Sequence, residues 1–228
     1  MAGIPSLLSA LFIVGMDNLI YKSTTTGWVE VPGGRKAIDI AVDSKNQTWI
    51  VGMNNAVSVF KNGAWVEVPG SLAARDISVS PNGDPYVIGM NYAILRNDGT
   101  KWTELQVGAR GITISIDGTG RPWMLATNGV TYYFEGGIWI PYPPGGAGIR
   151  IAASPDGVPY LLGTDRVVYN STINTWVKGR GTGVGVDIAV DSQERPWLVG
   201  WDNGIWYYEA EDWRRFPGGK KALRIAVR

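Results

Sequence analysis

The chain has 228 residues, of which 45% are apolar and 18% charged, and its formal net charge is +1. This balance is typical of a globular domain and argues against partners that need clustered Lys and Arg, so we expect no nucleic-acid binding and no membrane insertion. The chain has no Cys and no His, which removes disulfides, thiolate chemistry and the commonest metal ligand and general base, so we expect no metal, no cofactor and no enzymatic activity.

The first residues, MAGIPSLLSALFIVG, are apolar but do not have the pattern of a leader. They lack a positively charged start, and the apolar run is too short to span a bilayer. Phe12 to Gly15 also occupy positions that recur along the chain. We therefore predict no leader and no membrane segment, and the missing cysteines are compatible with a cytoplasmic location.

The clearest set of predicted strands follows the N-terminal stretch. Segments rich in β-branched and aromatic residues lie at 37–42, 48–53, 56–61 and 64–70, and turn residues separate them. Asn54-Asn55 and Asn62-Gly63 occupy two of the joints, where a two-residue hairpin needs residues that tolerate positive φ. No helical period appears, so this unit is predicted to form four antiparallel strands, named a to d.

The same pattern recurs every 37 residues without an insertion. One position in strand d is always Trp, one in strand b is always aromatic, one in strand a is always Ile, and one at the end of strand b is always small. The four ladders are Trp28, Trp65, Trp102, Trp139, Trp176 and Trp213; Phe12, Trp49, Tyr86, Trp123, Tyr160 and Trp197; Ile40, Ile77, Ile114, Ile151, Ile188 and Ile225; and Gly15, Gly52, Gly89, Ala126, Gly163 and Gly200. A repeat of this length predicts a solenoid, a propeller or an array.

Six units of four strands predict an all-β fold, a six-bladed β-propeller that occupies residues 1–228 as a single domain. The last segment, 221–228, supplies a strand a, whereas the segment from about Leu11 to Pro32 supplies strands b, c and d of the same blade. We expect these two segments to pair and close the ring, which removes exposed sheet edges. The Ile and aromatic ladders should fill the space between blades, and the small ladder should let strand b approach its neighbours.

The repeated motif reads W-x-x-V-P-G-G, then x-x-I-x-V, then P-W-x-x-G-x-x-N-x-I-Y, as in GWVEVPGG (27–34), AIDIAV (37–42) and RPWLVGWDNGIW (195–206). This motif resembles the tectonin repeat over all six units, and the chain looks especially like the fungal tectonins. The resemblance implies a compact lectin with several equivalent sugar sites, a preference for O-methylated glycans, a role in innate defence against foreign organisms, and no catalysis. Gln106 and Arg180 replace the turn proline in two units.

The joint between strands b and c combines the groups that a sugar site needs. Its middle residue is Asp or Asn in every unit, and such side chains can bind pairs of hydroxyls. The residue before it is Met, Met, Met, Thr, Thr and Trp in chain order, and methionine suits the methyl ether of an O-methylated sugar. The candidate carbohydrate-binding residues are Met16, Asp17, Met53, Asn54, Met90, Asn91, Asn128, Asp165, Trp201 and Asp202, with charged donors Lys36, Arg75, Arg110 and Lys221 from the d–a connections.

Other interpretations of these joints stay open. Asp and Asn are also common at two-residue turns, because they tolerate a left-handed backbone and hydrogen-bond to it. The a–b turns on the opposite face are a rival site, through Asn46, Asn82, Asp84 and Asp156. The SPNG and SPDG joints at 80–83 and 154–157 are similar to those of WD-repeat propellers, but the W-D dipeptide that ends strand c in that family is missing.

The first a–b turn differs from the others because Leu7 and Leu8 stand where the other units have polar residues. Exposed apolar residues mark interfaces, so we predict a homo-oligomer that covers this loop. The alternative is that both leucines fold back over their own blade.

Two other classes of function are weighed against a lectin. A scaffold that binds a protein should differ strongly from blade to blade, since its partner has no sixfold symmetry, whereas the b–c joints are similar. An enzyme would gather its catalytic residues in a central funnel. The residues at the corresponding strand a positions are too varied to suggest an acid–base pair; they are Asp39, Asp76, Thr113, Arg150, Asp187 and Arg224.

Overall fold

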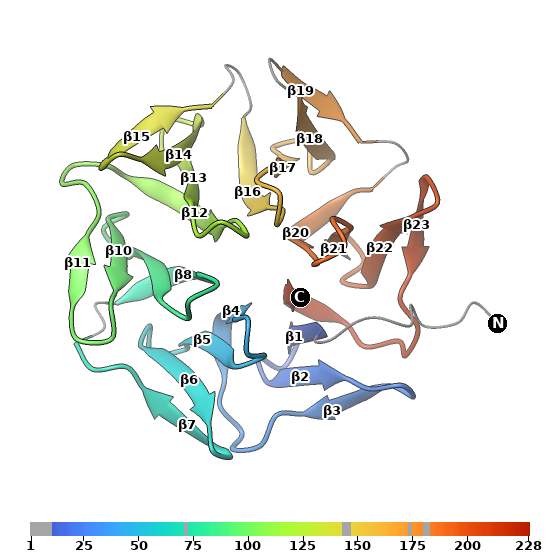
Figure 1. The fold of residues 1–228 in the computed structure, drawn as a ribbon. Coiled ribbons are helices and arrows are strands. Elements are labelled where there is room, and N and C mark those ends of the chain that lie inside the picture. The colour runs from blue at the N-terminus through green and yellow to red at the C-terminus, as the bar shows by residue number, and fades with distance from the viewer. Residues whose placement is uncertain (1–10, 71–72, 143–146, 173–174, 180–182) are drawn as a thin grey trace.

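The computed structural model describes residues 11–70, 73–142, 147–172, 175–179 and 183–228. Within them the chain forms six four-stranded antiparallel sheets, arranged as blades around a central axis (Figure 1). Every regular element assigned to these residues is a strand, so the predicted all-β, six-bladed propeller is confirmed. No helix that could reach across a bilayer occurs in the described part of the chain.

In each blade the strands a to d follow one another from the axis outward. Blade 1 contains β24 (Ala222–Val227), β1 (Leu11–Gly15), β2 (Ile20–Ser23) and β3 (Trp28–Glu30); blade 2 contains β4 (Ala37–Val42), β5 (Thr48–Gly52), β6 (Val57–Lys61) and β7 (Ala64–Glu67); blade 3 contains β8 (Ala74–Val79), β9 (Pro85–Gly89), β10 (Ile94–Asn97) and β11 (Trp102–Glu104). Blade 4 contains β12 (Gly111–Ile116), β13 (Pro122–Ala126), β14 (Thr131–Glu135) and β15 (Ile138–Pro141); blade 5 contains β16 (Gly148–Ala153), β17 (Pro159–Gly163), β18 (Val168–Thr172) and β19 (Thr175–Lys178); blade 6 contains β20 (Gly185–Val190), β21 (Pro196–Gly200), β22 (Ile205–Glu209) and β23 (Asp212–Arg215).

The strands predicted for the second unit match β4 to β7, with differences at their ends. β5 ends at Gly52 rather than Met53, because Met53 begins the turn and its N–H donates to the carbonyl of Lys36, 3.2 Å away. β7 ends at Glu67, before the turn that contains Pro69. The joints themselves have the expected backbone, since Asn55 has a φ of 62°.

The ring closes through the two ends of the chain, as predicted. β24 pairs antiparallel with β1, and Ile225 lies opposite Ile13. Blade 1 therefore takes its inner strand from the C-terminal segment and its three outer strands from the N-terminal segment (Figure 1). The Leu7–Leu8 loop precedes β1 and lies outside the described residues.

Six apolar clusters lie between successive blades and form the core. Between blades 1 and 2, Phe12 and Ile40 are buried and Trp65 packs against them. The aromatic, Ile and Trp ladders meet in the same way in the other gaps, so the prediction that they fill the space between blades is confirmed. The indole N–H of Trp65 also donates to the carbonyl of Pro32, 3.0 Å away, and so joins blade 2 to the turn that ends blade 1.

Gln106 stands where four of the other turns have proline, and it makes a contact of its own between blades. Its Oε1 accepts the backbone N–H of Trp139, 2.9 Å away, so the turn after blade 3 is tied to strand d of blade 4. Arg180, the other departure from the motif, lies outside the described residues.

Candidate functional site

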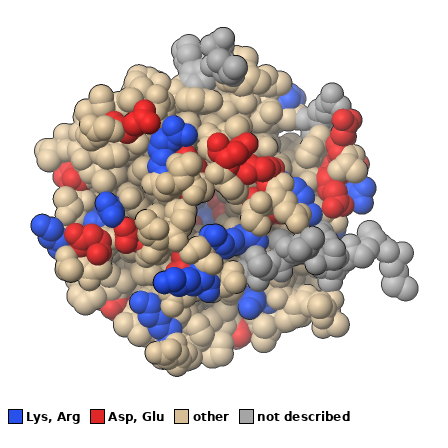
Figure 2. Space-filling view, viewed as in Figure 1, with Lys and Arg blue, Asp and Glu red and all other residues tan. Residues whose placement is uncertain are grey.

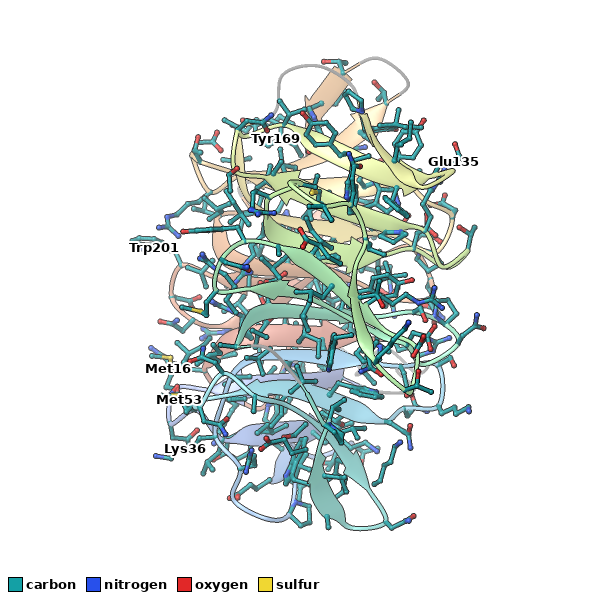
Figure 3. All side chains as sticks on the ribbon, turned by 90° about the vertical axis from the view of Figure 1, so that its left-hand side faces the viewer. Met16, Lys36, Met53, Glu135, Tyr169 and Trp201 are labelled. Carbon is teal, nitrogen blue, oxygen red and sulfur yellow. The ribbon has the colours of Figure 1, made fainter. Side chains whose placement is uncertain are left out.

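The six b–c joints lie on one side of the ring, and four of them expose a large apolar side chain. Met16, Met53, Met90 and Trp201 are 52%, 55%, 54% and 64% exposed; we call them the knob residues. Figure 3 shows Met16, Met53 and Trp201 at one edge of the molecule and Glu135, the last residue of strand c in blade 4, at the opposite edge. Thr127 and Thr164 occupy the same position in blades 4 and 5 and are also exposed.

The Asp or Asn beside each knob position shapes the turn. Its Oδ1 accepts the backbone N–H of the residue two positions on, at 2.9–3.2 Å in all six blades. This is the Asx-turn arrangement, which replaces a backbone hydrogen bond with one from the side chain. One oxygen of every candidate Asp and Asn is therefore partly used, and the other polar atom has the greater capacity for a ligand.

The small ladder at the end of strand b makes room for that oxygen. A Cβ added at Gly52 would lie 2.7 Å from Oδ1 of Asn54, and one at Gly163 would lie 2.5 Å from Oδ1 of Asp165. We expected these glycines to let strand b approach neighbouring strands, but at these positions the nearest atom belongs to the turn side chain. Ala126 shows that one methyl group can be accommodated, because Asn128 still accepts the N–H of Val130 at 3.0 Å.

The second polar atom of the turn residue differs between blades. Asp17 and Asp165 each accept the hydroxyl of a tyrosine four residues on, at 2.6 and 2.7 Å, and these hydrogen bonds are the main reason that both carboxyls have a lowered pKa. Asn128 donates its amide to Tyr132, 3.0 Å away. The amide nitrogens of Asn54 and Asn91 donate to no described residue. Blades 2 and 3 therefore offer an exposed Met beside an available amide.

The third residue of each joint connects neighbouring blades, and sequence reasoning missed it. Amide Nδ2 of Asn55 lies 3.8 Å from the sulfur of Met90 in the next blade, and the guanidinium of Arg166 lies 4.5 Å from the ring centre of Trp201. The sequence does contain a signal for these residues, because they recur every 37 residues, and all of them have a positive φ. They are Asn18, Asn55, Tyr92, Gly129, Arg166 and Asn203. Tyr92 and Arg166 adopt this left-handed conformation although it costs them more energy than it costs Gly or Asn.

The four charged candidates from the d–a connections are placed differently. The carbonyl of Lys36 accepts the N–H of Met53, which sets an exposed Lys beside a knob residue. Arg75 stacks on the ring of Tyr92, 4.7 Å from its centre. Lys221 is exposed, but the side chain of Arg110 pairs with Glu104, 3.1 Å away. Arg110 is thus the member of this set whose charge is already paired.

The a–b turns, the rival location, use their polar groups for the core. Oδ2 of Asp43 accepts the indole N–H of the buried Trp49 at 3.1 Å, and Asp117 and Asp191 hold Trp123 and Trp197 in the same way. In blade 3, Asp84 forms an ion pair with Arg96, 2.6 Å away, and in blade 5 Asp156 accepts the hydroxyl of Ser154. These turns therefore leave fewer polar atoms for a ligand than the joints of blades 2 and 3 do.

A cavity of about 430 Å³ lies at the centre of the ring, where Figure 2 shows a hollow. Each strand a has a bulge next to its central charged or polar position, and five of these six residues line the cavity, all except Arg224. Arg150 pairs with Asp76 and lies 3.3 Å from Asp187, and Arg224 lies 3.5 Å from Asp39. Five of the six varied strand a residues are thus charged and interact with one another in one network, whereas Thr113 is uncharged.

The network also joins blades. The carboxylates of Asp39, Asp76 and Asp187 accept the N–H of Ile77, Ile114 and Ile225 in the following blades, at 2.8, 2.7 and 2.9 Å. Burial, reinforced by the nearby charge of Asp76, holds the pKa of Asp39 well above its usual value. Among the described residues, no three Asp or Glu side chains are grouped in a way that could hold a metal ion.

Comparisons with known proteins identify the fold. No protein-family model and no curated protein matches the chain. Solved structures do: YCF48 bound to a D1 peptide has 16% identity and a TM-score of 0.59, covering 94% of this chain and 83% of that one. Virginiamycin B lyase from Staphylococcus aureus has 16% identity and a TM-score of 0.60, covering 93% and 89%. A gluconolactonase from Xanthomonas campestris has 12% identity and a TM-score of 0.66, covering 91% and 82%. The chain is therefore a β-propeller similar to proteins of varied function.

Proposed function

We propose that the chain is a multivalent carbohydrate-binding protein whose b–c joints bind O-methylated glycans. The observation that carries the proposal is the set of knob residues, each more than half exposed at an equivalent turn. A turn needs its Asp or Asn but does not need an apolar neighbour, and exposed apolar side chains mark binding surfaces. The similarity of the repeat to tectonins supports the same conclusion.

The joints of blades 2 and 3 have the chemistry that such a ligand needs. The sulfur and methyl group of Met53 or Met90 give a polarizable apolar contact for a methyl ether. The free amide of Asn54 or Asn91 can donate to a ring hydroxyl. Lys36, which is exposed beside Met53, adds a charged donor. We expect blades 4 and 5, with Thr127 and Thr164, to bind more weakly.

Repetition makes a weak site useful. Several equivalent sites on one ring raise the overall affinity for a dense glycan surface by roughly 10²–10⁴-fold, without any new contact. A homo-oligomer held together through Leu7 and Leu8 would multiply the sites again. Light scattering on a variant with Leu7→Asp and Leu8→Ser tests this second step, and an unchanged oligomer mass would refute it.

A glycan array that carries methylated and unmethylated versions of the same sugars tests the proposal. We expect binding to the methylated versions to be at least about tenfold stronger, because one methyl group in an apolar pocket contributes roughly that much discrimination. A variant with Met16→Ala, Met53→Ala and Met90→Ala should lose this preference. Ile138→Ala is the matched control, since Ile138 is 56% exposed beside a c–d turn. Equal binding of both versions, or loss in the control, contradicts the proposal.

A scaffold that binds proteins is the second candidate, and one observation favours it. The four knob residues expose apolar side chains on one face of the ring, and Tyr92 adds another that is 40% exposed. Such a surface also suits a protein partner. This function is favoured if the array gives no signal and the triple Met variant loses a binding partner that the Ile138→Ala control keeps.

A further inference from the structure

One gap between blades lacks the side chain that fills the others. The residue three positions after the Trp of strand d packs between its own blade and the next. In five blades it is apolar and large enough to fill the gap: Val31, Val68, Leu105, Tyr142 and Phe216. In blade 5 it is Gly179. Gly179 still donates its N–H to the carbonyl of Val168 at 2.8 Å, as its equivalents do to theirs, so this hydrogen bond is kept although the side chain is missing.

A cavity of about 400 Å³ occupies this gap, between β18 of blade 5 and β22 and β23 of blade 6. The volume falls within the roughly 300–1,000 Å³ of ligand pockets. Tyr160, Tyr208 and Trp213 supply aromatic walls, and the rings of Tyr208 and Trp213 are 5.5 Å apart. Asn170 supplies an amide where the neighbouring blades 4 and 6 have Tyr133 and Tyr207. The cavity is therefore larger than the loss of one side chain would leave.

Arg195 lines the cavity, and one of its buried donors is unsatisfied. Its Nε donates to Asp191 at 2.8 Å and its Nη1 lies 3.5 Å from Glu209. Its Nη2 is buried and has no hydrogen-bond partner among the residues that the structure describes. A buried N–H group without a partner is unfavourable, and a ligand that offers an acceptor in the cavity would remove that cost.

Glu194 departs from the repeat in the same gap. The equivalent residues in blades 2 to 5 are Asn46, Gly83, Gly120 and Gly157, all with positive φ, a conformation that suits Asn and Gly. Glu194 has a φ of 62° and keeps a long acidic side chain there. Its carboxylate accepts the N–H of Asp156 at 3.1 Å, lines the cavity, and has a pKa raised mainly by burial. Three departures from the repeat thus meet in one gap.

We propose that the gap between blades 5 and 6 is a binding site for a single pyranose ring, separate from the b–c joints. A sugar ring matches all three features, because its C–H face packs on aromatic rings and its hydroxyls both accept and donate hydrogen bonds. A hydroxyl oxygen accepts from Nη2 of Arg195, and a hydroxyl proton is donated to Glu194. An organic cation would suit the aromatic walls and the carboxylate but would leave Arg195 unsatisfied. The chain has one such site rather than six. The proposal does not depend on whether the b–c joints bind a sugar.

The test separates the two kinds of site. A protein with Met16→Ala, Met53→Ala, Met90→Ala and Trp201→Ala lacks the knob residues. Ligand-observed NMR with methyl α-glycosides of glucose, galactose, mannose, fucose and N-acetylglucosamine then reports on the remaining binding. We expect at least one glycoside to bind this variant with one site per chain. If none of the five binds, the proposal is wrong, whatever the result for the b–c joints.

Two further substitutions locate the site. Gly179→Leu, which copies Leu105, and Asn170→Tyr, which copies Tyr133, should each fill the cavity and weaken binding at least tenfold. They are independent, so a folding defect in one leaves the other informative. Val107→Leu is the control, because Val107 is 86% exposed and lies in no gap. Glycoside binding that survives both filling variants, with circular dichroism unchanged, would show that the gap is only a packing defect.

Discussion

Asp117 and Asp165 are both turn residues of the same repeat, yet they lie on opposite faces and have opposite surroundings. Asp117, in an a–b turn, is buried and accepts hydrogen bonds from the N–H groups of Thr119 and Arg121 and from the indole of Trp123. Asp165, in a b–c turn, is exposed and accepts only from its own hairpin, through Val167 and Tyr169. The Asp of the a–b turn therefore supports the core, whereas the Asp of the b–c turn only closes its own hairpin, which leaves the residue before it free to serve a ligand.

The largest effect should follow from breaking the a–b turn. Asp117→Ala leaves the buried indole N–H of Trp123 and two backbone N–H groups without acceptors, and each such loss costs about 1–3 kcal/mol. We expect urea unfolding to show a loss of ~3 kcal/mol or more. The double variant Asp117→Ser, Trp123→Tyr copies the Ser80 and Tyr86 pair of blade 3. It should recover most of the lost free energy of unfolding. A loss below about 1 kcal/mol would mean that the two faces do not differ as described.

The second effect concerns the pH dependence of a buried carboxylate. The pKa of Asp39 is raised, mainly by burial, so the folded form releases its proton at a higher pH than the unfolded form, which loses it near pH 4. Its contribution to stability is therefore greatest below pH 4 and falls as pH rises toward the folded pKa. Urea unfolding from pH 4 to pH 8 measures this effect. Asp39→Asn should remove the fall in the free energy of unfolding, so the variant becomes more stable relative to the parent as pH rises. A difference that does not vary with pH would contradict the raised pKa.

The third effect is smaller, because the b–c turn is exposed. Asn54→Ala removes one side-chain hydrogen bond to the N–H of Ala56, worth about 0.5–1.5 kcal/mol. We expect urea unfolding to show a loss of about 1 kcal/mol and glycan binding to weaken. Asn54→Asp keeps the accepting oxygen and serves as the control for the turn. If it restores stability but not binding, the amide acts on the ligand rather than on the fold.

The smallest effect should have the opposite sign to that of Asp39. The pKa of Asp17 is lowered, mainly by the hydroxyl of Tyr21, so its contribution to stability is present above pH 4 and is lost as pH falls through the folded pKa. Asp17→Asn should flatten the acid side of the stability profile slightly. Tyr21→Phe should have a similar effect, since it removes the same hydrogen bond. A steeper acid profile in either variant would contradict this assignment.

The repeat alone determined the fold, and the physical reason is packing. Every gap between blades must be filled by the same kinds of side chain in the same register, so Trp28, Ile40 and their equivalents recur where an apolar cluster will form. Ring closure also followed from the register, because Ile225 belongs to the Ile ladder and pairs opposite Ile13. The exposed knob residues could likewise be read from the sequence, as apolar residues at predicted turns.

Only the tertiary structure decided how the polar groups are used. Whether Asn54 serves its turn or a ligand depends on which of its two polar atoms has a partner, and the sequence pattern is the same in both cases. The meeting of Asp39, Asp76, Arg150 and Arg224 depends on blades that are distant in the sequence, and so does the contact of Arg166 with Trp201. The cavity beside Gly179 is visible in the sequence as a missing side chain. Its volume and its unsatisfied Arg195 come from the packing of two sheets, which no single repeat contains.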